Sequence, residues 1–481
     1  MRWTVQQVAQ ALGVAVPSGL SPVARLAGVS IDSRAVGRGQ LFIAIRGPRH
    51  DGHDFVAAAL HSGAEAAVVA NDRLSSYDGD IRSRLFAAAD TLAALQNLGQ
   101  AVRRAWGRRI AAVTGSVGKT TTKEILAALL GAKFRVLKSE GNLNNEYGLP
   151  LTLLRLEPED KAAVVELGMS HRGELRRLAE IAEPEVGVVT RVAPVHLEFF
   201  ASIDEIALAK RELIEGLAGP DSVAVLNADD PRVARFAEVA RGRVLTFGCG
   251  ASAQFRAEKI QDHGAAGSEF EFISPAGRAP MALALPGRHS IENALAALAA
   301  ASVWGIGIAE AAGVLRNIKV GEMRGRLLEF ALGFALINDS YNSNPVALGA
   351  MVDLLTKTGN YRRRILAAGE MLELGPESPN LHREAGCYAA SRRVDSVVAV
   401  QGDAVQIVNG AVQAGMPSSQ AHFFADSSTA AAFLVDFVRP GDLLLVKGSR
   451  GVKMERIVEA LRAKYPLADD VPASAVRRGD S

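Results

Sequence analysis

The chain has 481 residues, and a typical domain size of roughly 150 residues predicts about three domains. Hydrophobic residues make up 48% of the chain and charged residues 22%, which excludes a disordered or collagen-like protein. Lysine and arginine number 54 against 52 aspartates and glutamates, so the overall charge does not favour binding to a nucleic acid. Cys249 and Cys387 form no Cys-x-x-Cys pair, which argues against a cysteine zinc site or a disulfide framework.

The sequence does not predict a membrane protein. Residues 1–13 are amphipathic and lack the apolar core of a signal peptide. The longest apolar stretch, residues 294–309, is interrupted by Ser302 and two glycines, and a membrane span needs about 20 strongly apolar residues. This stretch therefore predicts a buried helix, and we expect a cytoplasmic protein without membrane insertion.

Apolar runs alternate with amphipathic stretches along the chain, which is typical of α/β domains with mostly parallel sheets. The first unit is expected at residues 1–84. It is predicted to have strands at 41–45 and 66–70, a helix at 54–62 and a polar loop at 71–83. The fold class expected for the whole chain is therefore α/β.

The second unit, residues 85–314, begins with a predicted helix at 91–106 and a strand at 109–114. Glycines and basic residues in 319–326 predict a linker, which is a candidate hinge. The third unit is expected at residues 315–481. Its predicted strands are 335–338, 365–368, 396–400 and 442–446.

Residues 111–130, AAVTGSVGKTTTKEILAALL, predict a strand, a glycine-containing turn and a helix. Backbone N–H groups of residues 115–119 can surround a phosphate chain, because glycine allows close approach. Lys119 would supply charge to the terminal phosphates, and the Thr120 hydroxyl can ligate Mg²⁺. The match to the P-loop pattern is partial, since Val113 stands where a small residue is usual. A plain strand-to-helix turn is the alternative, but the flanking elements favour a nucleotide site.

Three polar residues come after apolar runs. Glu166 ends the run that begins at residue 162, in the place of a metal-ligating carboxylate; a glutamate that points to water is the alternative. His196 follows the run 186–189 and suits a second Mg²⁺ or a phosphate, although a lone histidine is more often structural. Asp339 can bind a hydroxyl pair such as a ribose or form an Asx turn.

Other polar residues allow simpler interpretations. Lys210 lies in a helical stretch and, from the residues alone, predicts a solvated lysine. The Asn-rich segment 140–150 is either a structural turn or a source of amides for a polar ligand. The arginine runs at 103–104, 108–109 and 362–364 predict solvated faces.

Several separated motifs occur together in one order, and the set resembles the Mur ligases, ATP-dependent amide-forming enzymes of peptidoglycan assembly. The resemblance covers residues 28–462, and residues 30–55 resemble the uridine-nucleotide domain of the tripeptide-forming and pentapeptide-forming members. Folylpolyglutamate synthase is similar in the central unit but not in this N-terminal segment. The motifs are TGSVGKTTTK, EGNLNNEYGLPLTLL, VVELGMSHRGEL, VAPVHLEFF with AKREL, LPGRHSIENALAA, GRLLEF, INDSYNSNP and VKGSRGVKMERI.

The third unit distinguishes between members of the family. It lacks the Asp-Asn-Pro-Arg type motif of ligases that add diaminopimelate or lysine, whereas residues 367–375 and 445–451 resemble ligases that add D-alanyl-D-alanine. The implied reaction joins D-alanyl-D-alanine to UDP-N-acetylmuramoyl-tripeptide through an acyl phosphate, which gives the pentapeptide precursor of peptidoglycan. One alternative is a related ligase that adds diaminopimelate or lysine to the UDP-MurNAc-dipeptide. An alternative of another class is a non-catalytic protein that binds ATP as a switch.

The resemblance implies three domains: a UDP-substrate domain, a central P-loop ATPase domain with a parallel sheet, and a C-terminal Rossmann-like domain. Asn293 is expected to contact adenine, and Arg326 and Asp339 to complete the nucleotide site. The residues expected to hold the ATP phosphates are Gly115, Ser116, Val117, Gly118, Lys119, Thr120 and Thr121.

The resemblance also implies catalytic, metal and substrate sites. Two Mg²⁺ ions are expected, one on Thr120 and Glu166 and one on His196. Lys210 is expected to be carbamylated and so to become an anionic metal ligand, which reverses the solvated interpretation. The expected catalytic residues are Lys119, Glu166, His196 and Lys210. The expected substrate contacts are Ser33, Arg34, Gly47, Asp51, His53, Asn144, Asn145, Lys447, Ser449 and Arg450.

Two segments depart from the family pattern. The residue before the loop of His196 is usually Asn, whereas here the run is Val-Thr-Arg at 189–191. The family's His-Asn-x-x-Asn pattern reads His-Ser-Ile-Glu-Asn at 289–293. Neither change removes a phosphate or metal ligand. The expected partners are small molecules only, and the expected state is a monomer.

Overall fold

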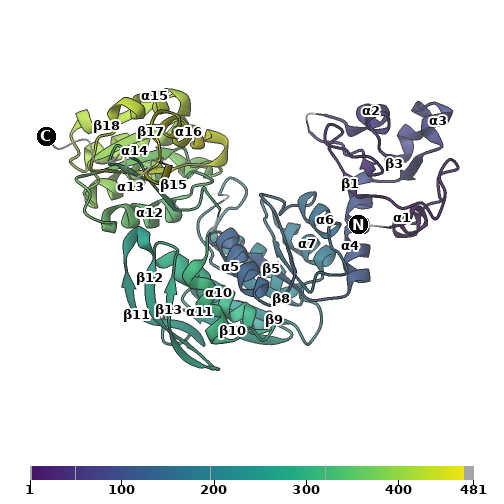
Figure 1. Ribbon diagram of the computed structural model, residues 1–481, viewed down its shortest axis with the longest axis horizontal. Helices are drawn as coiled ribbons and strands as arrows, with labels where there is room; N and C mark the ends of the chain where they lie inside the picture. Colours follow the sequence, from purple (N-terminus) through teal and green to yellow (C-terminus); the bar gives the residue numbers. More distant parts are fainter. Residues whose placement is uncertain (1–2, 49, 196, 320, 471–481) are drawn as a thin grey trace.

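The computed structural model describes residues 3–48, 50–195, 197–319 and 321–470. Within these residues the strands form three sheets, each built from one continuous stretch of the chain (Figure 1). Helices accompany every sheet, so the expected α/β class is confirmed. In Figure 1 the first and third sheets lie on opposite sides of the middle one.

The first sheet has the order β1-β2-β3-β4, and all of its strand pairs are parallel. The predicted strands and helix occur here. The predicted loop at 71–83 instead contains short helical turns, η2 and α3. The elements are α1 (Val5–Leu12), β1 (Val29–Ser30), β2 (Leu41–Ile43), η1 (Gly52–Phe55), α2 (Val56–His61), β3 (Ala66–Ala70), η2 (Asn71–Ser76), α3 (Gly79–Arg82) and β4 (Leu85–Ala88).

The middle sheet has the order β13-β12-β11-β10-β9-β8-β5-β7-β6. Its pairs are parallel from β6 to β11, and β11, β12 and β13 form an antiparallel extension. The elements are α4 (Thr91–Trp106), β5 (Ile110–Thr114), α5 (Lys119–Gly131), β6 (Val136–Lys138), α6 (Gly148–Leu153), β7 (Ala162–Glu166), α7 (Glu174–Ala182), β8 (Val186–Val189), α8 (Ile203–Glu215), β9 (Val223–Asn227), α9 (Pro231–Ala234), η3 (Arg235–Val239), β10 (Arg243–Gly248), β11 (Phe255–Asp262), η4 (Gly264–Ala266), β12 (Ser268–Ser274), β13 (Gly277–Leu283), α10 (Arg288–Ser302) and α11 (Ile308–Asn317).

Helices bury both faces of the parallel part of this sheet. The strands β5, β7 and β8 are buried along their whole length, because parallel strands between helix layers have no solvent face. One core contains α5 and α10, and the other contains α4, α7 and α8. The alanine-rich part of α10 is buried, which confirms the helix predicted from the long apolar stretch. No helix in the described part of the chain is long and apolar enough to cross a membrane.

The third sheet has the order β14-β15-β19-β16-β17-β18, parallel except for β14 at the edge. Cores lie on both of its faces, so this unit is Rossmann-like, as expected. The elements are β14 (Arg326–Glu329), β15 (Ala335–Asp339), α12 (Pro345–Lys357), β16 (Arg363–Gly369), η5 (Gly375–Glu377), α13 (Ser378–Ser391), β17 (Ser396–Val400), η6 (Gly402–Ala404), α14 (Val405–Gln413), η7 (Ser418–Gln420), β18 (Ala421–Phe424), α15 (Ser427–Phe437), β19 (Asp442–Lys447), η8 (Arg450–Val452), α16 (Glu455–Lys464) and η9 (Ala468–Asp470).

The prediction of solvated arginine runs is wrong at Arg103. This side chain is buried, donates from Nε to the Ala182 carbonyl at 2.8 Å and pairs with Glu185 at 2.7 Å. The cause is that α4 packs against α7, whose C-terminal carbonyls need donors. Arg104, the next residue, is exposed as predicted and pairs with Glu183.

Candidate active site

The loop between β5 and α5 is shaped by two glycines. Gly115 has φ +148° and Gly118 has φ +86°. A Cβ at Gly115 would lie 1.9 Å from Thr190 Oγ1, and one at Gly118 would lie 2.2 Å from Asn293 Oδ1. Only glycine fits both positions, so the backbone N–H groups at the start of α5 can approach an anion closely.

Lys119 is folded over this loop. Its Nζ donates to the Gly115 carbonyl at 2.7 Å and to the Ser116 carbonyl at 3.4 Å. Burial lowers the pKa of Lys119 from its ordinary 10.5, Glu166 raises it, and the charge of Arg324 lowers it further. Two cations therefore meet at the start of α5, which favours a bound anion there.

Glu166 ends β7 and is 4% exposed. Its Oε1 accepts a hydrogen bond from Asn144 Nδ2 at 2.9 Å, whereas Oε2 has no partner among the described residues. A buried carboxylate oxygen without a partner costs free energy. With the hydroxyl of Thr120, this oxygen therefore fits a hard divalent cation that takes oxygen ligands.

Lys210 lies on the inner face of α8 and is 2% exposed. The solvated interpretation from the residues alone is therefore wrong, because α8 packs against α7 and the sheet. Burial and the neighbouring Lys119 charge lower the pKa of Lys210 well below 10.5. An amine with a lowered pKa is a better nucleophile near neutral pH. His196 lies outside the described residues.

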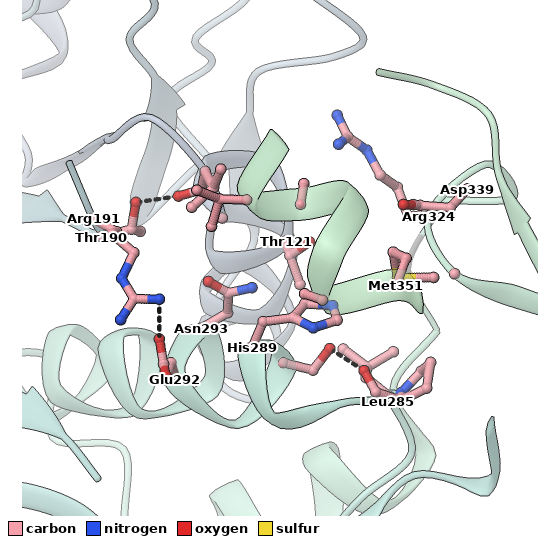
Figure 2. Close-up of a pocket in the computed structure, with 18 of the residues that line it drawn as sticks. Thr121, Thr190, Arg191, Leu285, His289, Glu292, Asn293, Arg324, Asp339 and Met351 are labelled. Carbon is pink, nitrogen blue, oxygen red and sulfur yellow. Dashed lines mark hydrogen bonds and ion pairs between the residues drawn. The ribbon is translucent and has the colours of Figure 1, made fainter. Parts of the chain in front are cut away.

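A pocket of about 140 Å³ lies between the middle and third sheets. Figure 2 shows His289, Glu292 and Asn293 of α10 along one side and Asp339 and Met351 toward the other. Val117, Gly118, Thr121 and Asn293 line the end formed by the loop of β5 and α5. Both of the sequence segments that depart from the family pattern also reach this pocket, through Arg191 and Glu292, which are 3.7 Å apart (Figure 2).

Asp339 and Lys447 form a buried ion pair at the wall of the pocket. They are register partners on β15 and β19. Lys447 Nζ donates to Asp339 and also to the Asn342 carbonyl at 2.8 Å. Lys447 is 3% exposed, so the pair holds the Asp339 carboxylate at the surface of the pocket from behind.

The linker carries two arginines near the pocket, and the expected role of Arg326 in the nucleotide site stays a prediction. Arg326 is half exposed, pairs with Glu322 at 2.8 Å and is not among the residues that line the pocket. Arg324 lines the pocket instead. Gly325 lies between them with φ +76°, so the chain turns and the two side chains diverge. One signal for an arginine at this point is present in the sequence, the run MRGR at 323–326, but this run contains both Arg324 and Arg326.

The expected substrate residues of the first unit fall into two groups. Arg34 is exposed and pairs with Asp32 at 2.7 Å, while Ser33 is half-buried and Gly47 exposed. His53 is 3% exposed, with Nδ1 bonded to Asp51 and Nε2 accepting from the Ala70 N–H at 2.9 Å. Both ring nitrogens of His53 are thus hydrogen-bonded within this unit, and its expected contact with the substrate stays a prediction.

The Asn-rich segment combines both interpretations left open by the sequence. Asn144 supports Glu166, whereas Asn145 Oδ1 accepts from the Gly148 N–H at 2.9 Å and is a structural turn residue. In the third unit, Ser449 is buried and its Oγ accepts from the Leu372 N–H at 2.9 Å. Arg450 is exposed and pairs with Glu455 at 2.8 Å.

Comparisons with known proteins agree with this geometry. Three family profiles match: "Mur ligase family, catalytic domain" at residues 25–112, "Mur ligase middle domain" at 113–301, and "Mur ligase, glutamate ligase domain" at 323–450. The UDP-N-acetylmuramoyl-tripeptide–D-alanyl-D-alanine ligase of Bacillus subtilis (strain 168) is 34% identical over 90% of this chain and 93% of its own length.

Solved structures are similar over nearly the whole chain. MurF from Acinetobacter baumannii has a TM-score of 0.86 and 29% identity, covering 96% of this chain and 99% of its own. MurF ligase from Thermotoga maritima in complex with ADP has a TM-score of 0.78 and 29% identity, covering 91% and 97%. The similarity thus includes all three sheets.

Proposed function

This chain belongs to the Mur ligase family, and we propose that it joins D-alanyl-D-alanine to UDP-N-acetylmuramoyl-tripeptide with conversion of ATP to ADP. The observation that carries the proposal is the similarity to D-alanyl-D-alanine ligases across all three sheets. The pocket between the phosphate loop and the third sheet supports the use of ATP. We assign residues 1–84 to the UDP-linked substrate, 85–314 to ATP, and 315–481 to completion of the site, in a cytoplasmic protein.

The reaction has two steps in this proposal. A carboxylate oxygen of the tripeptide forms a bond to the γ-phosphorus, and the bond from that phosphorus to the bridging oxygen of ADP breaks. The amine of D-alanyl-D-alanine then attacks the carbonyl of the acyl phosphate. It loses a proton, and the carbon–oxygen bond to phosphate breaks, which leaves an amide and inorganic phosphate.

The first step brings two anions together. Their repulsion is about 4 kcal/mol at about 4 Å with an effective dielectric constant near 20. Lys119 would offset this charge. Its Nζ donates to the carbonyls of Gly115 and Ser116 and would exchange these hydrogen bonds for contacts with a phosphate. Thr120 and Glu166 would hold Mg²⁺, which supplies further stabilisation of charge on the phosphate oxygens when it is bound.

Lys210 suits the carbamate implied by the family resemblance. Its amine, with a lowered pKa, would attack CO₂ to form a nitrogen–carbon bond and release one proton. The product is an anion close to Lys119, whose charge would stabilise it. A second metal ion at His196 stays a prediction from the resemblance.

The test measures phosphate release from ATP with UDP-N-acetylmuramoyl-tripeptide and a panel of amines, with mass spectrometry of the amide product. The panel is D-alanyl-D-alanine, D-alanine, diaminopimelate, lysine and glutamate, and parallel reactions use the UDP-MurNAc-dipeptide. We expect turnover only with the tripeptide and D-alanyl-D-alanine. Turnover with diaminopimelate or lysine on the dipeptide would replace the proposed substrate. ATP binding without any amide product would favour a switch protein.

A further inference from the structure

A second lysine of α5 is buried and has no part in the reaction described above. Lys123 lies one turn after Lys119 and is 1% exposed. Its Nζ donates to the Ser139 carbonyl at 2.8 Å and lies 2.9 Å from Glu124 Oε1. Burying an ammonium costs free energy unless the group is paired and hydrogen-bonded. These partners therefore hold Lys123 in one position, and one of them, Ser139, lies outside α5.

Ser139 follows β6 and is hydrogen-bonded through its N–H, its carbonyl and its hydroxyl. The N–H donates to the Val164 carbonyl of β7 at 3.0 Å, and the carbonyl accepts from Lys123. The Oγ accepts from the Glu166 N–H at 3.1 Å. Ser139 is 1% exposed, so these bonds are shielded from water. The residue thus joins α5 to the end of β7, the strand that carries Glu166.

The segment that begins at Ser139 also holds the Glu166 side chain. Asn144 Nδ2 donates to Glu166 Oε1 at 2.9 Å, and the Asn144 carbonyl accepts from the Gly168 N–H at 2.8 Å. Glu166 is therefore held at its backbone by Ser139 and at one carboxylate oxygen by Asn144. The other oxygen, Oε2, has no partner among the described residues, so this segment determines where the oxygen that suits a cation points.

The proposed Mg²⁺ site takes its ligands from two elements, Thr120 from α5 and Glu166 from β7. Mg²⁺ requires nearly ideal octahedral geometry, so two such elements have to be spaced correctly to within a few tenths of an ångström. Lys123 lies three residues after Thr120 on α5. Its bond to Ser139 ties this helix to the segment that holds Glu166. Lys123 and Ser139 thus connect the two elements that supply the ligands.

We propose that Lys123 and Ser139 are positioning residues for the Mg²⁺ site, and that they set the distance between Glu166 and Thr120. The proposal rests on the proposed function, which places Mg²⁺ on those two side chains. Lys123 and Ser139 do not contact the ion; they act on it through Glu166. Removing the hydrogen-bond partner of a metal ligand typically lowers metal affinity by about 10-fold to 100-fold.

The first experiment measures metal binding, because it does not depend on turnover. Mn²⁺ is the probe, and the electron paramagnetic resonance signal of free Mn²⁺ reports its binding to the protein saturated with ADP. We expect Ser139→Ala and Lys123→Met each to weaken Mn²⁺ binding about 10-fold, since each breaks the connection to Glu166. Ser139→Thr keeps the hydroxyl and should stay within about 3-fold of wild type. ADP affinity measured without a divalent cation should be unchanged in all three variants.

Two matched variants separate this role from a general loss of packing. Ser222→Ala removes a buried hydroxyl of the middle unit that has no partner among the described residues. Lys138→Ala removes the lysine next to Ser139, which is 43% exposed and pairs with Glu124. Both variants should keep the wild-type affinity for Mn²⁺. The double variant Lys123→Met with Ser139→Ala should bind Mn²⁺ no more weakly than the weaker single variant, because both residues act through one connection.

Three results of this experiment would overturn the proposal. They are equal Mn²⁺ affinities in Ser139→Ala and Ser139→Thr, a loss of metal-free ADP binding as large as the loss of Mn²⁺ binding, and a double variant in which the two losses multiply. If Lys123→Met does not fold, the two Ser139 variants still decide, because they differ in the hydroxyl environment of Glu166. If the wild type makes no amide with any amine, the ligase function fails, while Mn²⁺ binding still decides the role of these residues.

The second experiment follows turnover while the Mg²⁺ concentration is varied. Ser139→Ala should need about 10-fold more Mg²⁺ to reach half of its maximal rate, with an unchanged KM for D-alanyl-D-alanine. Excess Mg²⁺ should restore most of kcat, because the ligands themselves are intact. A slower Ser139→Ala enzyme with the wild-type Mg²⁺ requirement would contradict the positioning role, since the serine would then act on something other than the metal site.

Discussion

The phosphate end of the pocket and its outer wall differ in how the chain assembles them. Residues 115–121 form the phosphate end from one loop and one helix start. The outer wall combines Arg324 of the linker, Asp339 of β15, Met351 of α12 and Lys447 of β19. Local geometry is therefore enough to make a phosphate site, whereas the complete pocket exists only after the third sheet has docked.

This difference separates two requirements of the reaction. The phosphate end takes its N–H groups and Lys119 from the middle unit alone. The outer wall adds a second cation and encloses the pocket. An acyl phosphate hydrolyses when water reaches it, so enclosure before chemistry preserves the product of the first step.

The largest effect is expected when the phosphate end loses its charge. Lys119→Ala should lower kcat/KM about 1,000-fold, because nothing else in the loop replaces the ammonium at the terminal phosphates. Phosphate release with D-alanyl-D-alanine measures the effect. Lys161→Ala is the control, since Lys161 is exposed on a distant loop. An unchanged rate in Lys119→Ala would contradict the role of this loop.

In the outer wall, the largest loss of stability is expected when its buried ion pair is removed. Asp339→Asn leaves the ammonium of Lys447 buried without its carboxylate partner, which costs about 3 kcal/mol in the free energy of unfolding. Denaturant unfolding followed by circular dichroism measures this change. Asp204→Asn, which removes an exposed pair with Arg232, should cost less than about 1 kcal/mol. Equal costs would mean that the buried pair does not stabilise the wall.

A smaller effect is expected from the buried amine behind the phosphate end. The pKa of Lys210 is lowered in the folded protein, so between that pKa and 10.5 the unfolded chain binds a proton that the folded chain does not. Stability should therefore rise with pH in this window, by at most about 1.4 kcal/mol per pH unit. Lys210→Met should lack this contribution. Unfolding at pH 8.5 and 9.5 in CO₂-free buffer tests it, and the same pH dependence in both proteins would contradict the lowered pKa.

The smallest effect is expected at a contact of the third unit outside the pocket. Lys357 of α12 lies 4.0 Å from Asp262 of β11 and is 64% exposed. Lys357→Ala should change the free energy of closure by less than about 0.5 kcal/mol, and so the KM for ATP by less than about 3-fold. A steady-state titration with ATP measures it. A 10-fold change would show that this charge pair helps to dock the outer wall.

The sequence was sufficient to predict the phosphate end. The strand before the loop and the buried strand that ends in Glu166 were predicted within one residue, and the helix after the loop was predicted without exact bounds. Each is specified by consecutive residues, through a continuous apolar run, two glycines and a helix start. The antiparallel strands β11, β12 and β13 were not predicted, because they contain no continuous apolar run like those of the parallel strands, although β12 alternates buried and exposed residues.

Tertiary packing decides the positions of several side chains that the residues alone could not fix. Lys210 and Arg103 are charged residues on amphipathic helices, and only the neighbouring helices determine that they face inward. His53 lies beside Asp51 in a turn whose other partner is the distant strand β3. Arg324 and Arg326 are the same residue type two positions apart, so the sequence alone does not show which one faces the pocket. In the structure, the turn at Gly325 separates their side chains, and the ring of Tyr341 packs against Arg324.

The strand order of the third sheet has a consequence for how the protein is made. β19 lies between β15 and β16, although it is synthesised after both of them. During translation the earlier strands therefore emerge without the neighbour that joins them, and the sheet can close only once Lys447 has left the ribosome. The phosphate loop is complete far sooner, because the middle sheet precedes the third sheet in the chain. A nascent chain that stops before residue 442 thus holds a phosphate loop with no outer wall, and it lacks the means to form an acyl phosphate in an enclosed pocket.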